Sequence, residues 1–234
     1  MIDINNTEKL LENRNILGTI VPVAGRTIVD LTASYEDLII EVVKAKYLAS
    51  SGPEAVISCC SKLITWLRSS DFYTAPASTR YHEAHAGGLL VHTLNVYNNT
   101  VTLRCIPQFA STDLVSAALV ALTHDWCKIS MYESYEKNVK NEKTGEWEKQ
   151  LAFRTNQTGI TLGHGVSSMF LASKFFRLTP EEALAIRWHM SHWRVAQDEI
   201  NELQKSNEDF PLVHLVQFAD QLSITKYANL SFSK

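Results

Sequence analysis

The stretch LVSAALVALTHDWCKI, residues 114–129, decides the fold of this chain. Its first half is apolar on almost every side, and a helix of that kind belongs in the middle of a protein. We predict that Ser111 or Thr112 caps this helix and that it runs to about Asp125. His124 and Asp125 then end a buried helix, where they are either structural caps or functional groups.

Helical patterns also occur on both sides of this stretch. One begins at Leu31, and the sequence Gly52-Pro53-Glu54 is typical of a helix start, with a run to about Ser69. Three more helices are expected, from Gly87-Gly88 to about Leu103, from the capping box Thr179-Pro180-Glu181-Glu182 to about Trp193, and from Pro211 to about Leu230. The sequence therefore predicts a mostly α protein.

Two segments depart from the helical pattern. Residues 15–30 are β-branched and interrupted by glycine and proline, which predicts short strands or an extended arm. Residues 133–160 mix charges with spaced apolar residues around Lys143-Thr144-Gly145, which predicts a charged β-hairpin between two helices. We expect a single helical bundle with a short N-terminal β segment and a hairpin insertion, in which residues 1–70 pack on a core formed by residues 71–234.

The composition is that of a folded protein with a large core. The chain has 234 residues, of which 45% are hydrophobic and 20% charged, and it contains only nine Gly and six Pro. These values exclude a disordered or collagen-like chain. Lys and Arg number 22 against 25 Asp and Glu, a net charge of −3, so no basic excess is present to hold a long nucleic-acid duplex.

Single polar residues occupy the inward faces of several predicted helices. Asp220 lies on the same stripe as Val213 and Val216, and a buried carboxylate is costly unless it is paired, hydrogen-bonded or bound to a metal. Three histidines take comparable positions in their helices: His92 in GGLLVHT, His164 between two glycines, and His189 after Ile186. Each alone is more often structural than a ligand. Together with the His-Asp pair they offer imidazole and carboxylate, the groups that divalent metals bind.

The order of these residues resembles the HD-domain superfamily of metal-dependent phosphohydrolases. Five motifs carry the resemblance between about residues 72 and 230: YHEAHAGGLLVHT, LTHDWCKI, LGHGVSS, IRWHM and FADQLS. They look like the motifs of bacterial and phage HD-domain hydrolases and of HD-type 3′–5′ exoribonucleases. The resemblance implies an HD-domain hydrolase fold over residues 71–234, whereas the first 70 residues match no motif of the family.

The resemblance also implies a centre with two metal ions. The first ion would be bound by His92, His124, Asp125 and Asp220, and the second by His164 and His189, with Asp125 as the bridge. The family pattern places His82 near the substrate phosphate, and Lys128 either on the phosphate or beside the attacking water. His192 is a further candidate for a phosphate contact, with a surface or structural role as the alternative. His85 and His214 are expected to be structural.

The chemistry implied by this resemblance is hydrolysis at phosphorus. Two divalent ions bridged by a carboxylate lower the pKa of a water and hold a phosphate, so Asp125 and Lys128 are the expected catalytic residues. Nitrogen and oxygen donors without cysteine favour Mn²⁺, Fe²⁺, Co²⁺, Ni²⁺ or Mg²⁺ over Zn²⁺. Two alternatives stay open: a di-iron oxygenase with the same ligands, and a non-catalytic module that binds metal and nucleotide.

The sequence also indicates where the protein works and on what. Its first residues lack the basic and apolar parts of a signal peptide, and no apolar stretch is long enough to cross a bilayer. The four cysteines form no C-x-x-C pair and are expected to be reduced thiols, so we expect a cytoplasmic protein without a membrane partner. The expected substrate is a small phosphorylated molecule, either a nucleotide or a short single-stranded oligonucleotide. The patterns predict no oligomeric state.

Overall fold

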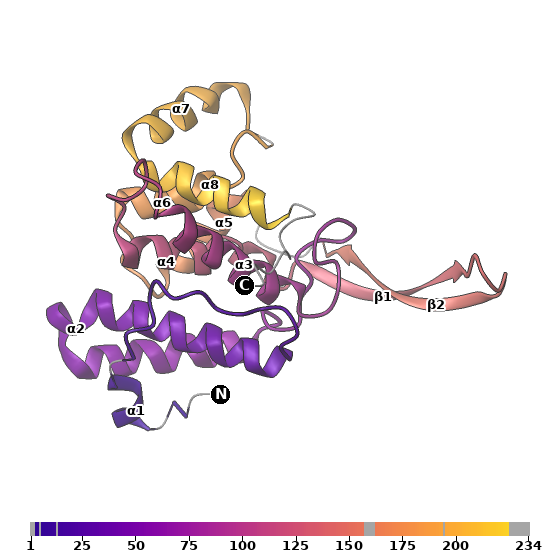
Figure 1. Ribbon diagram of the computed structural model, residues 1–234, viewed down its shortest axis with the longest axis horizontal. Helices are drawn as coiled ribbons and strands as arrows, with labels where there is room; N and C mark the ends of the chain where they lie inside the picture. The colour runs from indigo at the N-terminus through magenta and orange to yellow at the C-terminus, as the bar shows by residue number, and fades with distance from the viewer. Residues whose placement is uncertain (1–2, 5, 13, 157–161, 194, 225–234) are drawn as a thin grey trace.

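The structure is a computed structural model that describes residues 3–4, 6–12, 14–156, 162–193 and 195–224. Most of its elements are helices, and the β structure among the described residues is one antiparallel hairpin (Figure 1). The mostly α class is therefore confirmed. The elements are α1 (Thr7–Leu11), α2 (Ile28–Ser69), α3 (Gly88–Leu103), α4 (Leu114–Thr123), η1 (Trp126–Lys128), β1 (Tyr132–Lys140), β2 (Trp147–Thr155), α5 (His164–Ser173), α6 (Pro180–Trp188), η2 (Gln197–Glu199), α7 (Ile200–Asp209) and α8 (Pro211–Ser223).

Helix α4 lies at the centre of the molecule, as its sequence predicts. It contacts α2, α3, α5, α6 and α8, and its residues from Ala117 to Thr123 are all buried. Its cap is Asp113, whose carboxylate accepts a hydrogen bond from the Ser116 N–H at 2.7 Å, so the expected caps at Ser111 or Thr112 are wrong. Asp113 is the last extended residue before the helix, which is the position from which a side chain reaches the free N–H groups.

Helix α2 covers one side of the bundle and is interrupted at Gly52, which has a φ of 78°. The predicted helix start at Gly52-Pro53-Glu54 is found there, within a longer element. The hydroxyl of Tyr35 donates to the carbonyl of Leu122 at 2.9 Å and accepts from the indole of Trp126 at 3.0 Å. The buried residues of α2 and of the later helices belong to one continuous core.

Of the two alternatives expected for residues 15–30, the short β strands are wrong and the extended arm is confirmed for residues 14–27. Residues 14–27 run across the surface in extended and turn conformations, and no described residue among them belongs to a strand. The N–H and C=O groups of Val21 pair with the side-chain amide of Asn98 on α3, at 2.8 and 2.7 Å. The Asn98 side chain thus makes the hydrogen bonds to the Val21 backbone that a neighbouring strand would make in a sheet.

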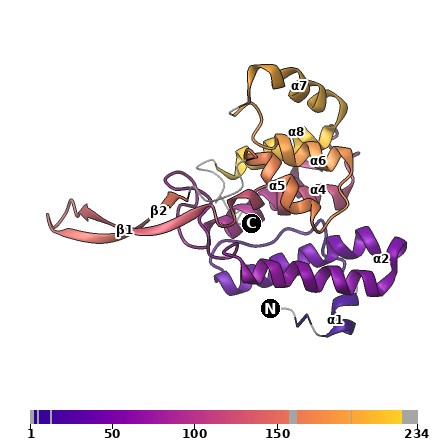
Figure 2. The same cartoon turned by 180° about the vertical axis from the view of Figure 1, so that it is seen from behind.

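The predicted hairpin is present and stands away from the helices. Strands β1 and β2 pair without a break from Tyr132 opposite Thr155 to Lys140 opposite Trp147. In both views the hairpin projects sideways from the helical body (Figures 1 and 2). Its base lies in the chain between η1, which directly follows the predicted ligand Asp125, and α5, which begins with the predicted ligand His164.

Other boundaries differ from the sequence predictions. Helix α6 begins with the expected capping box at Thr179 but ends at Trp188, well before Trp193. Helix α8 begins at Pro211 as expected and ends at Ser223, and the expected end at Leu230 lies outside the described residues. Among the described residues, no helix combines the length and apolar character that a membrane span requires.

Candidate metal centre

The six predicted metal ligands come together at one place in the bundle. All of them except His164 are buried, although they belong to segments far apart in the sequence. Helix α3 supplies His92, the end of α4 supplies His124 and Asp125, the first residue of α5 is His164, His189 directly follows α6, and α8 supplies Asp220.

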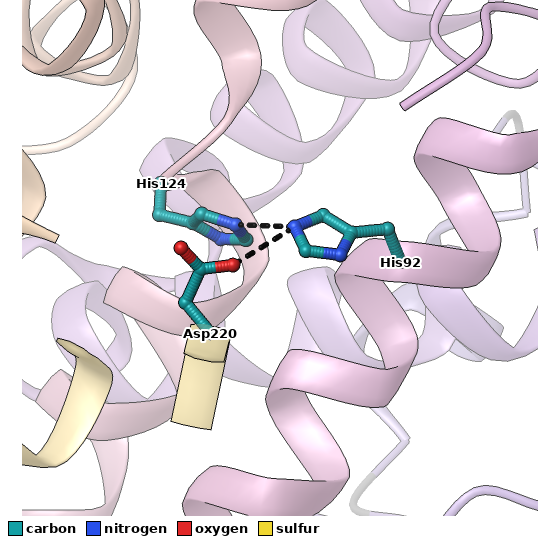
Figure 3. A group of neighbouring side chains, drawn as sticks. All are labelled: His92, His124 and Asp220. Carbon is teal, nitrogen blue, oxygen red and sulfur yellow. Dashed lines mark hydrogen bonds and ion pairs between the residues drawn. The ribbon is translucent and has the colours of Figure 1, made fainter. Parts of the chain in front are cut away.

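These side chains form two groups of possible ligands. His92, His124 and Asp220 make up the first group, in which the ligand atoms lie within 4.8 Å of one another (Figure 3). Asp125, His164 and His189 make up the second, with the same spacing. Figure 3 shows the Asp220 carboxylate and the His124 ring facing the Nε2 edge of His92. Each group could hold one divalent cation.

Asp125 connects the two groups through its separate oxygens. Its Oδ2 lies 3.1 Å from Nε2 of His92 and 3.4 Å from Nε2 of His124, both in the first group. Its Oδ1 lies 2.8 Å from Nε2 of His164 and 3.5 Å from Nε2 of His189, both in the second group. One carboxylate therefore faces both candidate sites.

Backbone carbonyls orient two of the histidine rings. Nδ1 of His124 lies 2.8 Å from the carbonyl of Ala121, and Nδ1 of His189 lies 2.7 Å from the carbonyl of Ile186. A carbonyl only accepts, so each Nδ1 carries the proton and each neutral ring turns the lone pair of Nε2 toward the centre. This is the tautomer that a metal ligand requires.

A hydroxyl has the same effect on His92. The Ser223 hydroxyl donates its proton to the carbonyl of Asp220 at 2.6 Å, so its oxygen accepts from Nδ1 of His92 at 3.0 Å. Nε2 of neutral His92 then carries a lone pair, and it lies only 3.3 Å from Nε2 of His124. Two lone pairs at this distance repel each other unless a proton or another cation lies beside them.

The charges of the centre favour a cation. Burial opposes a charge on His92, but the hydrogen bonds that its ring donates to the carboxylates of Asp125 and Asp220 outweigh burial and raise the pKa of His92. Burial alone would raise the pKa of Asp125, yet Lys128 and His124 hold it well below its ordinary value. The His92 hydrogen bond likewise overcomes burial and lowers the pKa of Asp220. Without a metal, a proton on His92 compensates the two carboxylates.

One buried atom tests whether the residues fit a metal. Nε2 of His189 is inaccessible to solvent and makes no hydrogen bond among the described residues, although its ring faces Asp125. An unpaired buried nitrogen is costly unless something binds it. Burial also lowers the pKa of His124 and of His164, which keeps both rings neutral as ligands. The donor set and its protonation therefore fit divalent cations.

Lys128 directly contacts one of the predicted metal ligands. Its side chain is buried, and Nζ lies 2.6 Å from Oδ2 of Asp125. Burial opposes its charge, but Asp125 outweighs this and raises the pKa of Lys128. The ammonium group is thus a direct partner of the carboxylate that faces both groups.

His82 lies beside the first group, and His192 lies outside both. The ring of His82 is 4.8 Å from that of His92, and its Nε2 is buried without a hydrogen bond among the described residues. Burial, followed by His92 and Lys128, lowers the pKa of His82 to about 4. His192 is exposed and bonds to the Ser191 hydroxyl, so the structure does not bring it to the centre.

Two further residues at the centre escape the sequence prediction. Ser223 orients His92, as described above, and its signal is its position one helical turn after Asp220. The thiol of Cys127 lies 3.3 Å from Nδ1 of His164, and burial raises its pKa to about 12, which keeps it a neutral thiol. The sequence feature that could have pointed to Cys127 is its position two residues after the His124-Asp125 pair.

The two histidines expected to be structural belong to neither group. His85 contacts Glu83, and His214 contacts Phe218.

Comparison with known proteins adds no relative. A scan against protein-family models and searches of curated proteins and of solved structures found no match to this chain.

Proposed function

We propose that this chain is an HD-type metal-dependent phosphohydrolase or phosphodiesterase that holds two divalent ions. One observation carries the proposal: the two oxygens of Asp125 face two separate groups of ligands, and each group adds histidines that turn Nε2 toward the carboxylate. A bridging carboxylate between two cations is the arrangement of binuclear hydrolytic centres. The five sequence motifs that resemble the HD superfamily support the same class.

The donor atoms limit the choice of metal. The first group offers two imidazole nitrogens and a carboxylate, and the second offers the same set through His164, His189 and Asp125. Cys127 is the nearest thiol, but it contacts the ring of His164 and keeps its proton. Nitrogen and oxygen ligands of this kind suit Mn²⁺, Fe²⁺, Co²⁺, Ni²⁺ or Mg²⁺ better than a structural Zn²⁺.

The residues around the centre have separate tasks in this proposal. Two bound divalent ions would lower the pKa of a water molecule and neutralise charge on a phosphate. Asp125 connects the two groups because each of its oxygens faces one of them. Lys128 fixes the position of the Asp125 carboxylate through its 2.6 Å contact. His82 is neutral at pH 7, and its unpaired Nε2 is available for a phosphate oxygen. A nucleotide or a short single-stranded oligonucleotide is the substrate class we propose.

An activity screen with defined metals tests this function. The metal-free protein is loaded with Mn²⁺ or Fe²⁺ and incubated with nucleotides, cyclic dinucleotides, short RNA and short DNA, while oxygen uptake is recorded. Release of a phosphorus-containing product without oxygen uptake supports the proposal. Oxygen uptake without such a product would make the protein an oxygenase, and bound metal without any turnover would make it a binding module.

A matched pair of variants shows whether the centre is responsible. Asp125→Asn keeps the size of the side chain and removes the charge, so it is expected to abolish the activity. Asp113→Asn makes the same chemical change at the cap of α4, on an exposed side chain at the opposite end of the helix. It is expected to retain the activity. Equal activity in both variants would show that the turnover arises elsewhere.

A further inference from the structure

Cys127 lies beside the second group of ligands, although the sequence patterns give it no role. It is the middle residue of η1, and its side chain is buried. The backbone N–H of Cys127 donates a hydrogen bond to the Ser168 hydroxyl on α5 at 3.0 Å, which links η1 to α5. The sulfur therefore has a defined position next to His164, the first residue of α5.

The His164 ring is held differently from the other histidines of the second group and of α4. Its Nε2 lies 2.8 Å from Oδ1 of Asp125, and the sulfur of Cys127 lies 3.3 Å from Nδ1 and 3.6 Å from Nε2. Since Nε2 already has the carboxylate as its partner, the thiol is the partner of Nδ1. In His124 and His189, a backbone carbonyl takes that place.

A thiol can bond to either tautomer of a neutral imidazole, because it both donates and accepts. The Asp125 carboxylate only accepts, so Nε2 of His164 carries the proton, and Nδ1 accepts from the S–H group of Cys127. A metal ion at Nε2 requires the other tautomer, in which Nδ1 carries the proton and donates it to the sulfur. The ring loses one proton at Nε2 and gains one at Nδ1, so it is neutral in both forms. A carbonyl in place of the thiol would suit only the second form.

His164 also depends on hydrogen bonds more than the other five ligands do. Its side chain is 29% exposed, whereas the other five are buried. Surrounding side chains lock the rotamer of a buried ring, but a partly exposed ring is held by fewer packing contacts. The bond to Cys127 is therefore one of the few contacts that fix the direction of Nε2 in His164.

We propose that Cys127 is the positioning residue of the second metal ion. Its thiol bonds to Nδ1 of His164 in both tautomers, and so it aims Nε2 at Asp125 before an ion binds and at the ion afterwards. The inference rests on the second ion of the proposed function and adds the residue that controls its binding. Partners of the non-ligating nitrogen of a histidine contribute about 10–100-fold to metal affinity. Sulfur forms weak hydrogen bonds, so the lower end of this range is expected for Cys127.

Calorimetric titration of the metal-free full chain with Mn²⁺ tests the proposal. The wild-type chain is expected to bind two ions. Cys127→Ala removes the bond to His164 and is expected to weaken the second ion by about 10-fold, while the first ion keeps its affinity. Cys127→Ser retains a group that donates and accepts, so it is expected to restore the second ion. Cys60→Ala is the matched control, because it removes a buried thiol on α2 and is expected to change neither affinity. Circular dichroism checks that each variant is folded.

The absorption spectrum of the Co²⁺-loaded chain adds a readout that does not depend on a destabilised variant. A cysteine sulfur bound to Co²⁺ gives an intense charge-transfer band in the near ultraviolet, and a thiol that only positions His164 gives none. A band that Cys127→Ser removes would make Cys127 a ligand and overturn the proposal.

The titration separates this inference from the proposed function, because no substrate is present. Equal affinity for the second ion in the wild-type and Cys127→Ala chains overturns the inference alone. So does a loss in Cys127→Ser as large as that in Cys127→Ala, or the same loss in Cys60→Ala. A wild-type chain that binds only one ion overturns the inference together with the two-ion centre. Two ions that bind as expected without any hydrolysis overturn the proposed activity and leave the role of Cys127 supported.

Discussion

Asp125 makes more contacts at the centre than any of the other predicted ligands. Its carboxylate faces a histidine of each group and also holds the ammonium of Lys128. Three histidines around it are oriented by hydrogen bonds from their Nδ1 atoms. The carbonyls of Ala121 and Ile186 accept from His124 and His189, and the Ser223 hydroxyl accepts from His92. The backbone that turns these rings inward is part of helices, so the ligand geometry follows directly from the packing of the helices.

The metal content of single variants is expected to fall in steps. Asp125→Ala is expected to lose both ions, because both groups need its carboxylate. His164→Ala and His189→Ala are expected to lose only the ion of the second group, leaving about one metal per chain. Elemental analysis of the purified proteins measures this. His85→Ala is the control, because His85 is exposed and contacts Glu83 instead. Full metal content in the His164 and His189 variants would contradict a centre with two ions.

Lys128→Met is expected to lower the unfolding free energy of the metal-free protein more than that of the metal-loaded protein. Removing one partner of a buried ion pair costs about 3–5 kcal/mol of unfolding free energy, and Lys128 is the direct partner of Asp125. Bound cations would supply the missing positive charge. Turnover is expected to fall by about 10²–10³, the scale for one electrostatic group. Denaturant unfolding with and without metal measures the difference.

The control for this variant is Lys149→Met, in which an exposed ion pair with Glu136 is removed from the hairpin. Exposed ion pairs contribute little to stability, so no change in the unfolding free energy is expected with or without metal. If Lys128→Met destabilised both forms equally, Lys128 would be a structural residue that the metal does not relieve.

At the scale of elements, Gly165 brings α5 and α6 close together. A Cβ atom at this position would lie 2.0 Å from the backbone carbonyl of Arg187. Backbone cannot move aside as a flexible side chain can, so only glycine lets the two helices approach this closely. This close approach brings two candidate ligands together, because His164 begins α5 and His189 follows α6. The centres of their rings lie 5.2 Å apart.

Gly165→Ala is therefore expected to separate the two histidines of the second group. The variant is expected to lose the second ion and to keep the first, whose ligands lie on other elements. Ser173→Ala is the control, because it changes an exposed residue at the far end of α5. Elemental analysis with circular dichroism measures the result. A folded Gly165→Ala protein with both ions would show that the close approach of α5 and α6 does not matter for binding.

At the scale of the whole molecule, the centre joins α4 to four elements that pack around it, namely α3, α5, α6 and α8. A ligand that binds the native state alone stabilises it by about 2.7 kcal/mol at a concentration one hundred times its Kd. For a chain of this size each kcal/mol shifts Tm by about 2–4 °C. A chelator is therefore expected to lower Tm by roughly 5–10 °C. The same chelator saturated with Ca²⁺ is the control, and equal Tm values would mean that no metal bridges the elements.

The stabilisation by metal is expected to shrink as the pH falls. The carboxylates of Asp125 and Asp220 raise the pKa of His92, so its proton competes with the metal for Nε2. Lowering the pH keeps this proton on the ring and weakens metal binding, whereas raising the pH releases it and strengthens binding. Metal titrations over a pH series measure the trend. A metal affinity that did not change below neutral pH would exclude His92 from the ligands.

The amino-acid sequence by itself determined the elements and the candidate ligands. An apolar run predicts a buried helix, and a polar residue on an apolar face is recognisable without a structure, which is how His92, Asp125 and Asp220 were found. The hairpin followed from local turn and strand patterns. For residues 15–30 the pattern left short strands and an extended arm open, because local sequence does not say what pairs with the backbone. The structure has the arm, in which the Asn98 amide pairs with the Val21 backbone.

Only the tertiary structure decided how the side chains meet. Periodicity places a residue on a face of its own helix, but it does not say which atoms of two helices face each other. The division of the Asp125 oxygens between two groups, the contact of Lys128 with that carboxylate, and the exposure of His192 all depend on packing between elements. The sequence therefore named the candidate ligands, and the packing of the helices around α4 set their geometry.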